Sequence, residues 1–94
     1  MTIKVLIKRN IPKTASNELN LIFMEMRAAA MQQPGYIGGE TLRRVDILEK
    51  SLIISRWQSL EDWTKWLVSD ERKKYQDKIE ALAEIETKCE VYQN

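Results

Sequence analysis

The chain lacks histidine altogether, and this absence excludes several kinds of active site. Histidine is the usual general base near neutral pH, the commonest metal ligand and the usual ligand of haem iron. A Ser-His-Asp triad, a Cys-His pair, a His-Glu-x-x-His zinc site and a two-His iron site are therefore excluded within the chain. We expect no bound metal.

Cysteine and excess charge are nearly absent too. Cys89 is the one cysteine, which suits a reducing compartment, and its place in a strand pattern predicts a buried small side chain. Fifteen basic and fourteen acidic residues give a net charge of +1, which is too little to attract nucleic acid or an anionic membrane. No apolar run approaches the roughly 20 residues of a membrane span, and the first residues lack the order of a signal peptide. We therefore predict a cytoplasmic protein that binds neither nucleic acid nor membrane.

The rest of the composition is that of an ordinary folded domain. Hydrophobic residues make up 44% of the chain and charged residues 31%, close to the average of globular proteins. A length of 94 residues is enough for one domain and too short for two. We predict a single domain over residues 1–94.

The first third of the chain predicts a strand and then a helix. Within residues 2–9, Ile3, Val5 and Ile7 alternate with Lys4 and Lys8, which is the period of a strand with one buried face. Thr14 or Ser16 can cap a helix that continues to about Gln33, where a Pro-Gly pair ends it. The apolar stripe of this helix consists of Leu19, Ile22, Phe23, Met26 and Ala30.

The middle of the chain predicts a hairpin. Residues 36–45 read as a strand with Gly38-Gly39 inside it, where a bulge or a close approach of strands is expected. The polar residues 46–50 turn the chain back. Residues 51–57 contain three consecutive large apolar side chains, which predicts a strand buried on both faces at the centre of the sheet.

The last third predicts two helices and a final strand. Ser59 followed by Asp62 approximates a capping box, and Ser69 followed by two acidic residues begins a second helix. The basic run at 72–74 on this helix reads as a solvated face with internal ion pairs. Residues 85–91 alternate again and predict the fourth strand.

The element order is therefore β-α-β-β-α-α-β, the α+β arrangement called ferredoxin-like, with its second helix broken in two. It predicts a four-stranded antiparallel sheet with all helices on one face. So short a chain has no further element to cover the other face. We predict that a second copy covers it in a symmetric homodimer.

Residues 33–44 (QPGYIGGETLRR) and 54–66 (ISRWQSLEDWTKW) resemble the antibiotic biosynthesis monooxygenase superfamily of dimeric α+β barrels. The marks of the resemblance are Pro-Gly-Tyr after the first helix and a strand that ends in Trp-x-Ser-x-Glu-x-Trp. The resemblance implies a cavity for a flat aromatic substrate between the sheet and the helices, and two sheets that meet in a barrel. Some members oxygenate polyketide-like phenols without metal or flavin, and related ones bind and degrade haem.

In the haem-degrading relatives an asparagine at the end of the first strand, a tryptophan on the second helical segment and a histidine one helix later form the site. Asn10 matches the asparagine and Trp66 matches the tryptophan. The histidine is absent, and Gln76 or its neighbour Tyr75 falls near its position. Because an amide is a poor iron ligand and a neutral phenol a weak one, ordinary haem degradation is disfavoured.

Each candidate residue also has a structural interpretation. The Asn10 amide can hold a phenolate or reduced oxygen by hydrogen bonding, or it can cap a turn. Arg56 can stabilise an anionic substrate, or strand alternation can send it to the surface or the dimer seam. Trp57, Trp63 and Trp66 can line an aromatic pocket or pack in the core.

The resemblance and these residues together favour a cofactor-independent monooxygenase acting on a small electron-rich aromatic of polyketide or quinol type. A deprotonated substrate of this kind can itself pass an electron to oxygen, although the pattern identifies no buried carboxylate as proton acceptor. The alternative is a non-catalytic dimeric module that binds a small apolar ligand, and the weaker alternative is a haem-binding or haem-degrading relative. The predicted catalytic residues are Asn10, Arg56 and Trp66, and the predicted ligand-binding residues are Phe23, Trp57, Trp63, Tyr75 and Gln76.

Overall fold

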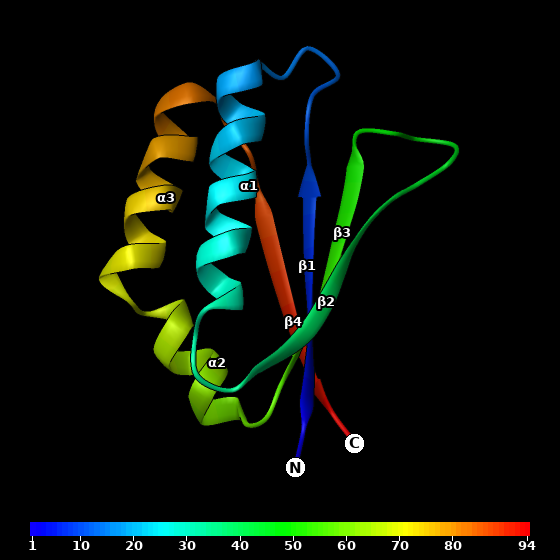
Figure 1. Cartoon of the computed structure of the whole chain (residues 1–94). Coiled ribbons are helices and arrows are strands. Elements are labelled where there is room, and N and C mark those ends of the chain that lie inside the picture. The colour runs from blue at the N-terminus through cyan, green and yellow to red at the C-terminus, as the bar shows by residue number, and fades with distance from the viewer.

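The computed structural model describes residues 1–94 and has the predicted element order. Figure 1 shows three helices on one side of one twisted sheet, with the other side of the sheet bare. The elements are β1 (Ile3–Asn10), α1 (Asn17–Met31), β2 (Tyr36–Arg43), β3 (Lys50–Trp57), α2 (Leu60–Leu67), α3 (Asp70–Leu82) and β4 (Thr87–Gln93). The ferredoxin-like α+β class is confirmed. No helix is long and apolar enough to cross a bilayer.

The strands lie in the order β2-β3-β1-β4, and each neighbouring pair is antiparallel. β3 is therefore central, as its apolar run predicted, while β2 and β4 are edge strands. Contrary to the prediction, Cys89 is exposed, because it lies on the edge strand β4.

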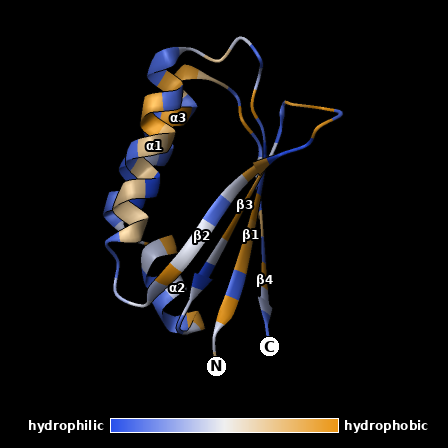
Figure 2. Ribbon diagram, turned by 45° about the vertical axis from the view of Figure 1, so that its right-hand side comes forward, coloured by the Kyte–Doolittle hydropathy of each residue, from blue (hydrophilic) through white to orange (hydrophobic).

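The core lies between the sheet and the helices. Along β1, Ile3, Val5 and Ile7 are buried and their neighbours are more exposed. Figure 2 shows hydrophobic residues on this strand interrupted by hydrophilic ones. Burying each such side chain contributes about 1.5–3 kcal/mol. The helices complete the core with Leu19, Ile22, Met26 and Ala29 from α1, Trp63 and Trp66 from α2, and Ile79 from α3.

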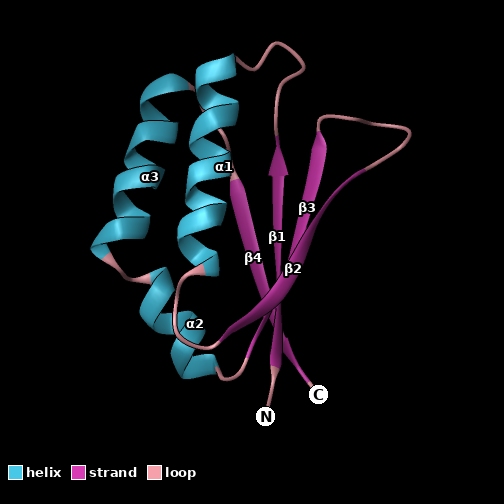
Figure 3. Ribbon diagram, in the orientation of Figure 1, coloured by secondary structure: helices cyan, strands magenta, loops and turns pink.

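Serine caps start all three helices. Ser16, Ser59 and Ser69 each accept a hydrogen bond at 3.1 Å from the backbone N–H three residues later. Each cap satisfies a donor that the first turn leaves free. The cap at Ser69 lets α3 begin directly after α2 in a new direction, which Figure 3 shows as a short loop between the two helices.

Glycines shape the path of β2 beside the helices. Gly35 has φ +86°, the left-handed conformation that glycine adopts after a helix. The pairing of β2 with β3 shifts register between Tyr36 and Gly38, which confirms the expected bulge. A Cβ atom on Gly39 would lie 2.8 Å from both the Ile54 carbonyl oxygen and the Tyr36 hydroxyl. The close approach at Gly39 therefore lets the Tyr36 ring lie against the sheet.

The bare face of the sheet carries the side chains that alternate along the strands with the helix-facing ones. Leu6, Leu52 and Ile54 are half-buried there, and Leu42 is exposed. The register pairs Leu6 with Ile54 and Leu42 with Leu52, so these side chains form one patch, which we call the bare-face patch. No helix covers it (Figure 1).

Candidate active site

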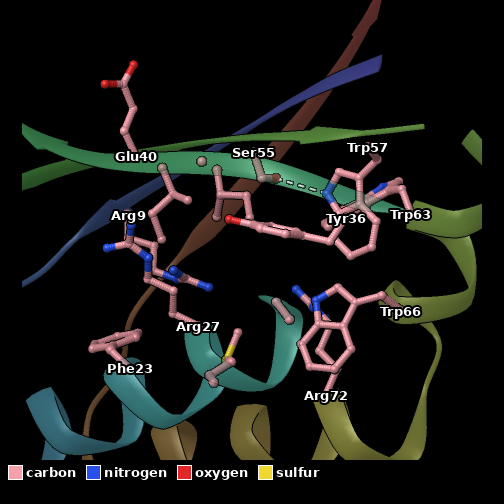
Figure 4. A pocket seen from close by; sticks show the side chains of 15 residues that line it. Arg9, Phe23, Arg27, Tyr36, Glu40, Ser55, Trp57, Trp63, Trp66 and Arg72 are labelled. Atoms are coloured by element: carbon pink, nitrogen blue, oxygen red, sulfur yellow. Dashed lines mark hydrogen bonds between the residues drawn. The ribbon is translucent and has the colours of Figure 1, made fainter. Parts of the chain in front are cut away.

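A pocket lies between the helix-facing side of the sheet and the helices, where the resemblance implied a cavity. Its volume, counted over the positions open to the centre of a water-sized sphere, is about 60 Å³, and 15 residues line it. Figure 4 shows that its large side chains come from the sheet above and the helices below. They are Arg9, Phe23, Met26, Arg27, Tyr36, Trp57, Trp63, Trp66 and Arg72.

One end of the pocket is aromatic. Trp57, Trp63 and Trp66 are at most 3% exposed, and the Trp57 ring lies edge-on to Tyr36 and Trp63 with centroids 5.3 and 5.7 Å away. The Trp57 indole N–H donates to Ser55 Oγ at 3.1 Å. The Trp66 indole nitrogen faces the pocket in Figure 4. The tryptophans therefore fill both roles that the sequence left open, since they pack the core and line a pocket.

The other end of the pocket holds a buried arginine. Arg9 follows Ile7 in the buried phase of β1 and is 5% exposed. Its Nε donates to Thr87 Oγ1 at 3.2 Å, and its guanidinium carbon lies 5.1 Å from the centre of the Phe23 ring. Its Nη2 is buried without a hydrogen-bond partner. Burial, and then the nearby charge of Arg72, lower the pKa of Arg9 to about 10.

Two more arginines bring the positive charge of the pocket to three guanidinium groups. Arg27 Nη1 donates to Thr41 Oγ1 at 3.1 Å, and Arg72 is half-buried, so that burial lowers its pKa. None of the ion pairs in the structure involves Arg9, Arg27 or Arg72. Glu40 is the one acidic residue in the lining, and Figure 4 shows its carboxylate turned away from the pocket. The pocket is therefore cationic and holds no acidic counter-charge.

The structure brings four of the predicted site residues to this pocket, namely Phe23, Trp57, Trp63 and Trp66. It does not bring Asn10 and Arg56 there. Asn10 pairs with Lys50 at the end of β1 and Arg56 pairs with Lys4, and both lie in the strand phase of the bare face. They therefore do not share the cavity of Trp66 within the chain, and Arg56 takes the surface position that strand alternation allowed for it.

Tyr75 and Gln76 also lie outside the pocket lining. Tyr75 packs against the core, and Gln76 Nε2 donates to Glu80 Oε1 at 3.5 Å along α3. Neither side chain at the position of the relatives' histidine therefore faces a ligand in the pocket. A porphyrin is also far larger than the pocket, so these residues do not fit haem. No group of three or more Cys, Asp and Glu side chains is placed to hold a metal ion.

The three arginines were missed in the sequence, although two signals pointed to them. Arg9 continues the odd-numbered, buried positions of β1, so alternation alone places it beside the core. Arg72 was read with its neighbours as part of a solvated, ion-paired face, but it is half-buried and forms no ion pair. Arg27 and Tyr36 carry no comparable signal, because their place depends on the packing of α1 against β2.

A second, more open hollow of about 590 Å³ lies at the end of the sheet near Asn10. Basic side chains dominate its lining, and Leu42 and Leu52 of the bare-face patch are its two hydrophobic residues. It therefore adjoins the surface for which a second copy was predicted, and it contains no tryptophan.

Comparison with known proteins places this site in context. The family model of the antibiotic biosynthesis monooxygenases matches residues 2–78. SnoaB from Streptomyces nogalater, described as a cofactor-independent oxygenase, superposes with a TM-score of 0.83 at 16% identity and covers 99% of this chain and 92% of its own. A conserved protein from Methanosarcina mazei gives a TM-score of 0.85 at 15% identity, with the same two coverages. Rv0793 from Mycobacterium tuberculosis gives 0.82 at 13% identity, covering 100% and 95%. Among curated proteins, none matches this chain in sequence.

Proposed function

Because this chain belongs to the antibiotic biosynthesis monooxygenase family, we propose that it is a cofactor-independent monooxygenase of a small electron-rich aromatic. The substrate binds in the pocket between the sheet and the helices. The observation that carries the proposal is the pocket itself, in which three guanidinium groups and three tryptophans surround a space without an acidic counter-charge. Such a lining suits a flat ring that carries a negative charge while it reacts.

The chemistry requires only the substrate and oxygen. A quinol first loses a phenolic proton to water, and the resulting anion gives one electron to O₂. The two radicals combine through a bond between a ring carbon and oxygen. The O–O bond and the C–H bond of that carbon then break, so that the ring gains a carbonyl and water leaves. The quinol supplies both electrons, and one oxygen atom ends in the product, a hydroxyquinone, while the other ends in water.

The arginines remove the need for a buried proton acceptor. At an effective dielectric constant of about 20, one positive charge about 4–6 Å from a phenolate stabilises the anion by roughly 3–4 kcal/mol. This lowers a phenol pKa by roughly 2–3 units, from about 10 toward neutral pH. The substrate therefore ionises to solvent, and the missing carboxylate that the sequence left unexplained is not required.

Trp66 is the candidate for contact with the reacting atoms. Its ring forms the floor of the aromatic end, and its indole N–H faces the pocket (Figure 4). An N–H donor in this place can hydrogen-bond an oxygen that becomes negative during the reaction. The Trp57 N–H is already bound to Ser55 Oγ, so Trp57 contributes a wall of the pocket.

The bare-face patch supports assembly as a homodimer. Leu6, Leu42, Leu52 and Ile54 form an apolar surface that no helix of the same chain covers. Two copies that stack these sheets face to face bury both patches and complete a barrel. Asn10 and Arg56 then lie at or near the seam between subunits.

An oxygen electrode tests the proposal with the purified protein, free of added metal and flavin. A panel of quinols and phenols with activated methylene groups is expected to include a substrate whose oxygen uptake scales with protein concentration. Trp66→Phe keeps an aromatic ring but removes the N–H, and it is expected to lower the rate while leaving the circular dichroism spectrum unchanged. No uptake above the uncatalysed rate with any member of the panel contradicts the proposal.

A ligand-binding module without turnover is the second candidate. The observation in its favour is that the pocket presents no acid-base pair. Native mass spectrometry of the freshly purified protein distinguishes the two functions. A retained organic molecule that is not consumed in oxygen supports the binding module, whereas its conversion to an oxidised product supports the enzyme.

A further inference from the structure

The pocket is polar at one end and aromatic at the other. Figure 4 shows Arg9 and Phe23 at one end, and Tyr36 with the tryptophans at the other. A ligand that matches both ends has a negatively charged group at one side of a flat apolar body.

Arg9 lacks the partner that a buried charge normally has. It is 5% exposed, and its Nη2 is buried without a hydrogen-bond partner. It contacts the Phe23 ring and the Thr87 hydroxyl, and the charge nearest to it in the pocket is the like charge of Arg72. Buried charges in proteins are usually paired with an opposite charge, because desolvation is otherwise uncompensated. No carboxylate of the chain reaches Arg9. A carboxylate that accepts hydrogen bonds from the guanidinium would supply both the missing charge and the missing acceptor.

One phenolate does not account for all of this positive charge. Arg72 lies near Trp66 in Figure 4, at the end where the reacting ring is expected, and its guanidinium can balance the charge of an ionised quinol there. Arg9 lies farther from Trp66, beside Phe23, and near enough to Arg72 for the two positive charges to repel. A ligand with a second negative group beside the ionised ring would balance both guanidinium groups.

The size of the pocket limits the ligand further. The 60 Å³ open to the centre of a water molecule corresponds to roughly four to six water sites, or roughly 120–180 Å³ of liquid volume. This is the space of a single aromatic ring with a small substituent. A three-ring polyketide is too large for it.

We propose that the substrate is a single-ring aromatic acid, whose carboxylate binds the guanidinium of Arg9 while its electron-rich ring lies against Trp66. This inference rests on the proposed monooxygenase function and specifies its substrate class. Arg9 then acts as a specificity-determining residue, since a neutral analogue of the same ring leaves its charge unpaired.

The test uses two probes that differ only in the carboxylate, 2,5-dihydroxybenzoate and hydroquinone. Binding of each to the folded 94-residue chain is measured by calorimetry without oxygen, so that no turnover occurs. A charged hydrogen bond contributes enough to favour the acid by about 10–100-fold. In Arg9→Met the acid is expected to bind no more than about threefold tighter than hydroquinone. Hydroquinone itself is expected to bind Arg9→Met and the unaltered protein with nearly the same affinity.

The matched control is Arg43→Met, which removes an exposed arginine that lines the neighbouring open hollow but not the pocket, and it is expected to leave the preference for the acid unchanged. Arg9→Lys restores the charge without the forked donors and is expected to recover part of the preference. Equal affinity of the unaltered protein for both probes overturns the inference, as does an acid preference that survives in Arg9→Met.

Oxygen uptake with the same two probes separates the two proposals. Turnover of neutral quinols without preference for the acid overturns the substrate class and leaves the monooxygenase standing. Tight binding of the acid by Arg9, without oxygen uptake on any aromatic acid, overturns the monooxygenase and leaves an organic-acid site.

Discussion

Arg9→Met is expected to make the ligand-free protein more stable, although it replaces a buried residue. The lowering of the pKa of Arg9 from its usual range to about 10 means that the fold disfavours the charged guanidinium by ~3 kcal/mol. Arg9 is protonated in both the folded and the unfolded chain at pH 7, so the folded state carries this full cost there and at every pH below the lowered pKa.

The interactions that Arg9 does make recover part of this cost. The stacking on Phe23 is worth about 1 kcal/mol and the hydrogen bond to Thr87 about another 1 kcal/mol. Methionine keeps most of the side-chain volume and adapts to irregular space. The net expectation is a gain of ~1 kcal/mol, which raises the melting temperature by about 4–8 °C in a domain of this size.

Thermal unfolding followed by circular dichroism in a buffer without organic acids measures this gain. Arg43→Met serves as the control and is expected to stay within about 0.5 kcal/mol of the unaltered protein, since Arg43 is exposed. Saturating 2,5-dihydroxybenzoate reverses the order of the two proteins, because at 100 times its dissociation constant a ligand stabilises by about 2.7 kcal/mol. A melting temperature of Arg9→Met several degrees below that of the unaltered protein, with an intact fold, shows instead that the guanidinium is structural and refutes the reasoning.

Three further predictions concern the dimer, the catalytic tryptophan and the response to acid. Ile54→Lys in the bare-face patch is expected to give monomers in sedimentation velocity. The control Leu21→Lys, on the exposed side of α1, is expected to leave the dimer intact. Equal sedimentation of the two variants contradicts the sheet-to-sheet assembly. Trp66→Phe is expected to lower kcat by about 10-fold or more and KM little, as loss of a donor to a developing anion does, and a change in KM alone refutes that role. The ion pair with Lys8 at 2.8 Å lowers the pKa of Glu90, so its stabilisation is present above the usual carboxyl value of 4.5 and is lost as the pH falls through the lowered pKa. Glu90→Gln is therefore expected to flatten the fall of the melting temperature below about pH 4.5, and an unchanged profile excludes the pair as its cause.

The backbone of this protein was predictable because each of its signals is local. Alternation in residues 2–9, the serine caps and the glycine after α1 depend on a few neighbouring residues, and the structure places all of them as expected. The pocket depends instead on which strand face meets the helices. The tryptophans lie on the helix-facing side, where their size places them in the core, whereas Asn10, whose polarity permits either side, lies in the strand phase of the bare face.

Asn10 and the overlooked Arg9 are adjacent in the sequence, and strand alternation decides which of them faces the helices. In a strand whose odd-numbered residues Ile3, Val5 and Ile7 are buried, residue 9 faces the helices and residue 10 does not. The resemblance to the family pointed to Asn10, whereas the strand period points to Arg9, whose buried charge costs folding free energy. A charge that is buried in a core and destabilises the fold is typical of a functional site, because its presence is not explained by a contribution to stability. The proposed substrate class therefore follows most directly from Arg9, which strand alternation alone places beside the core.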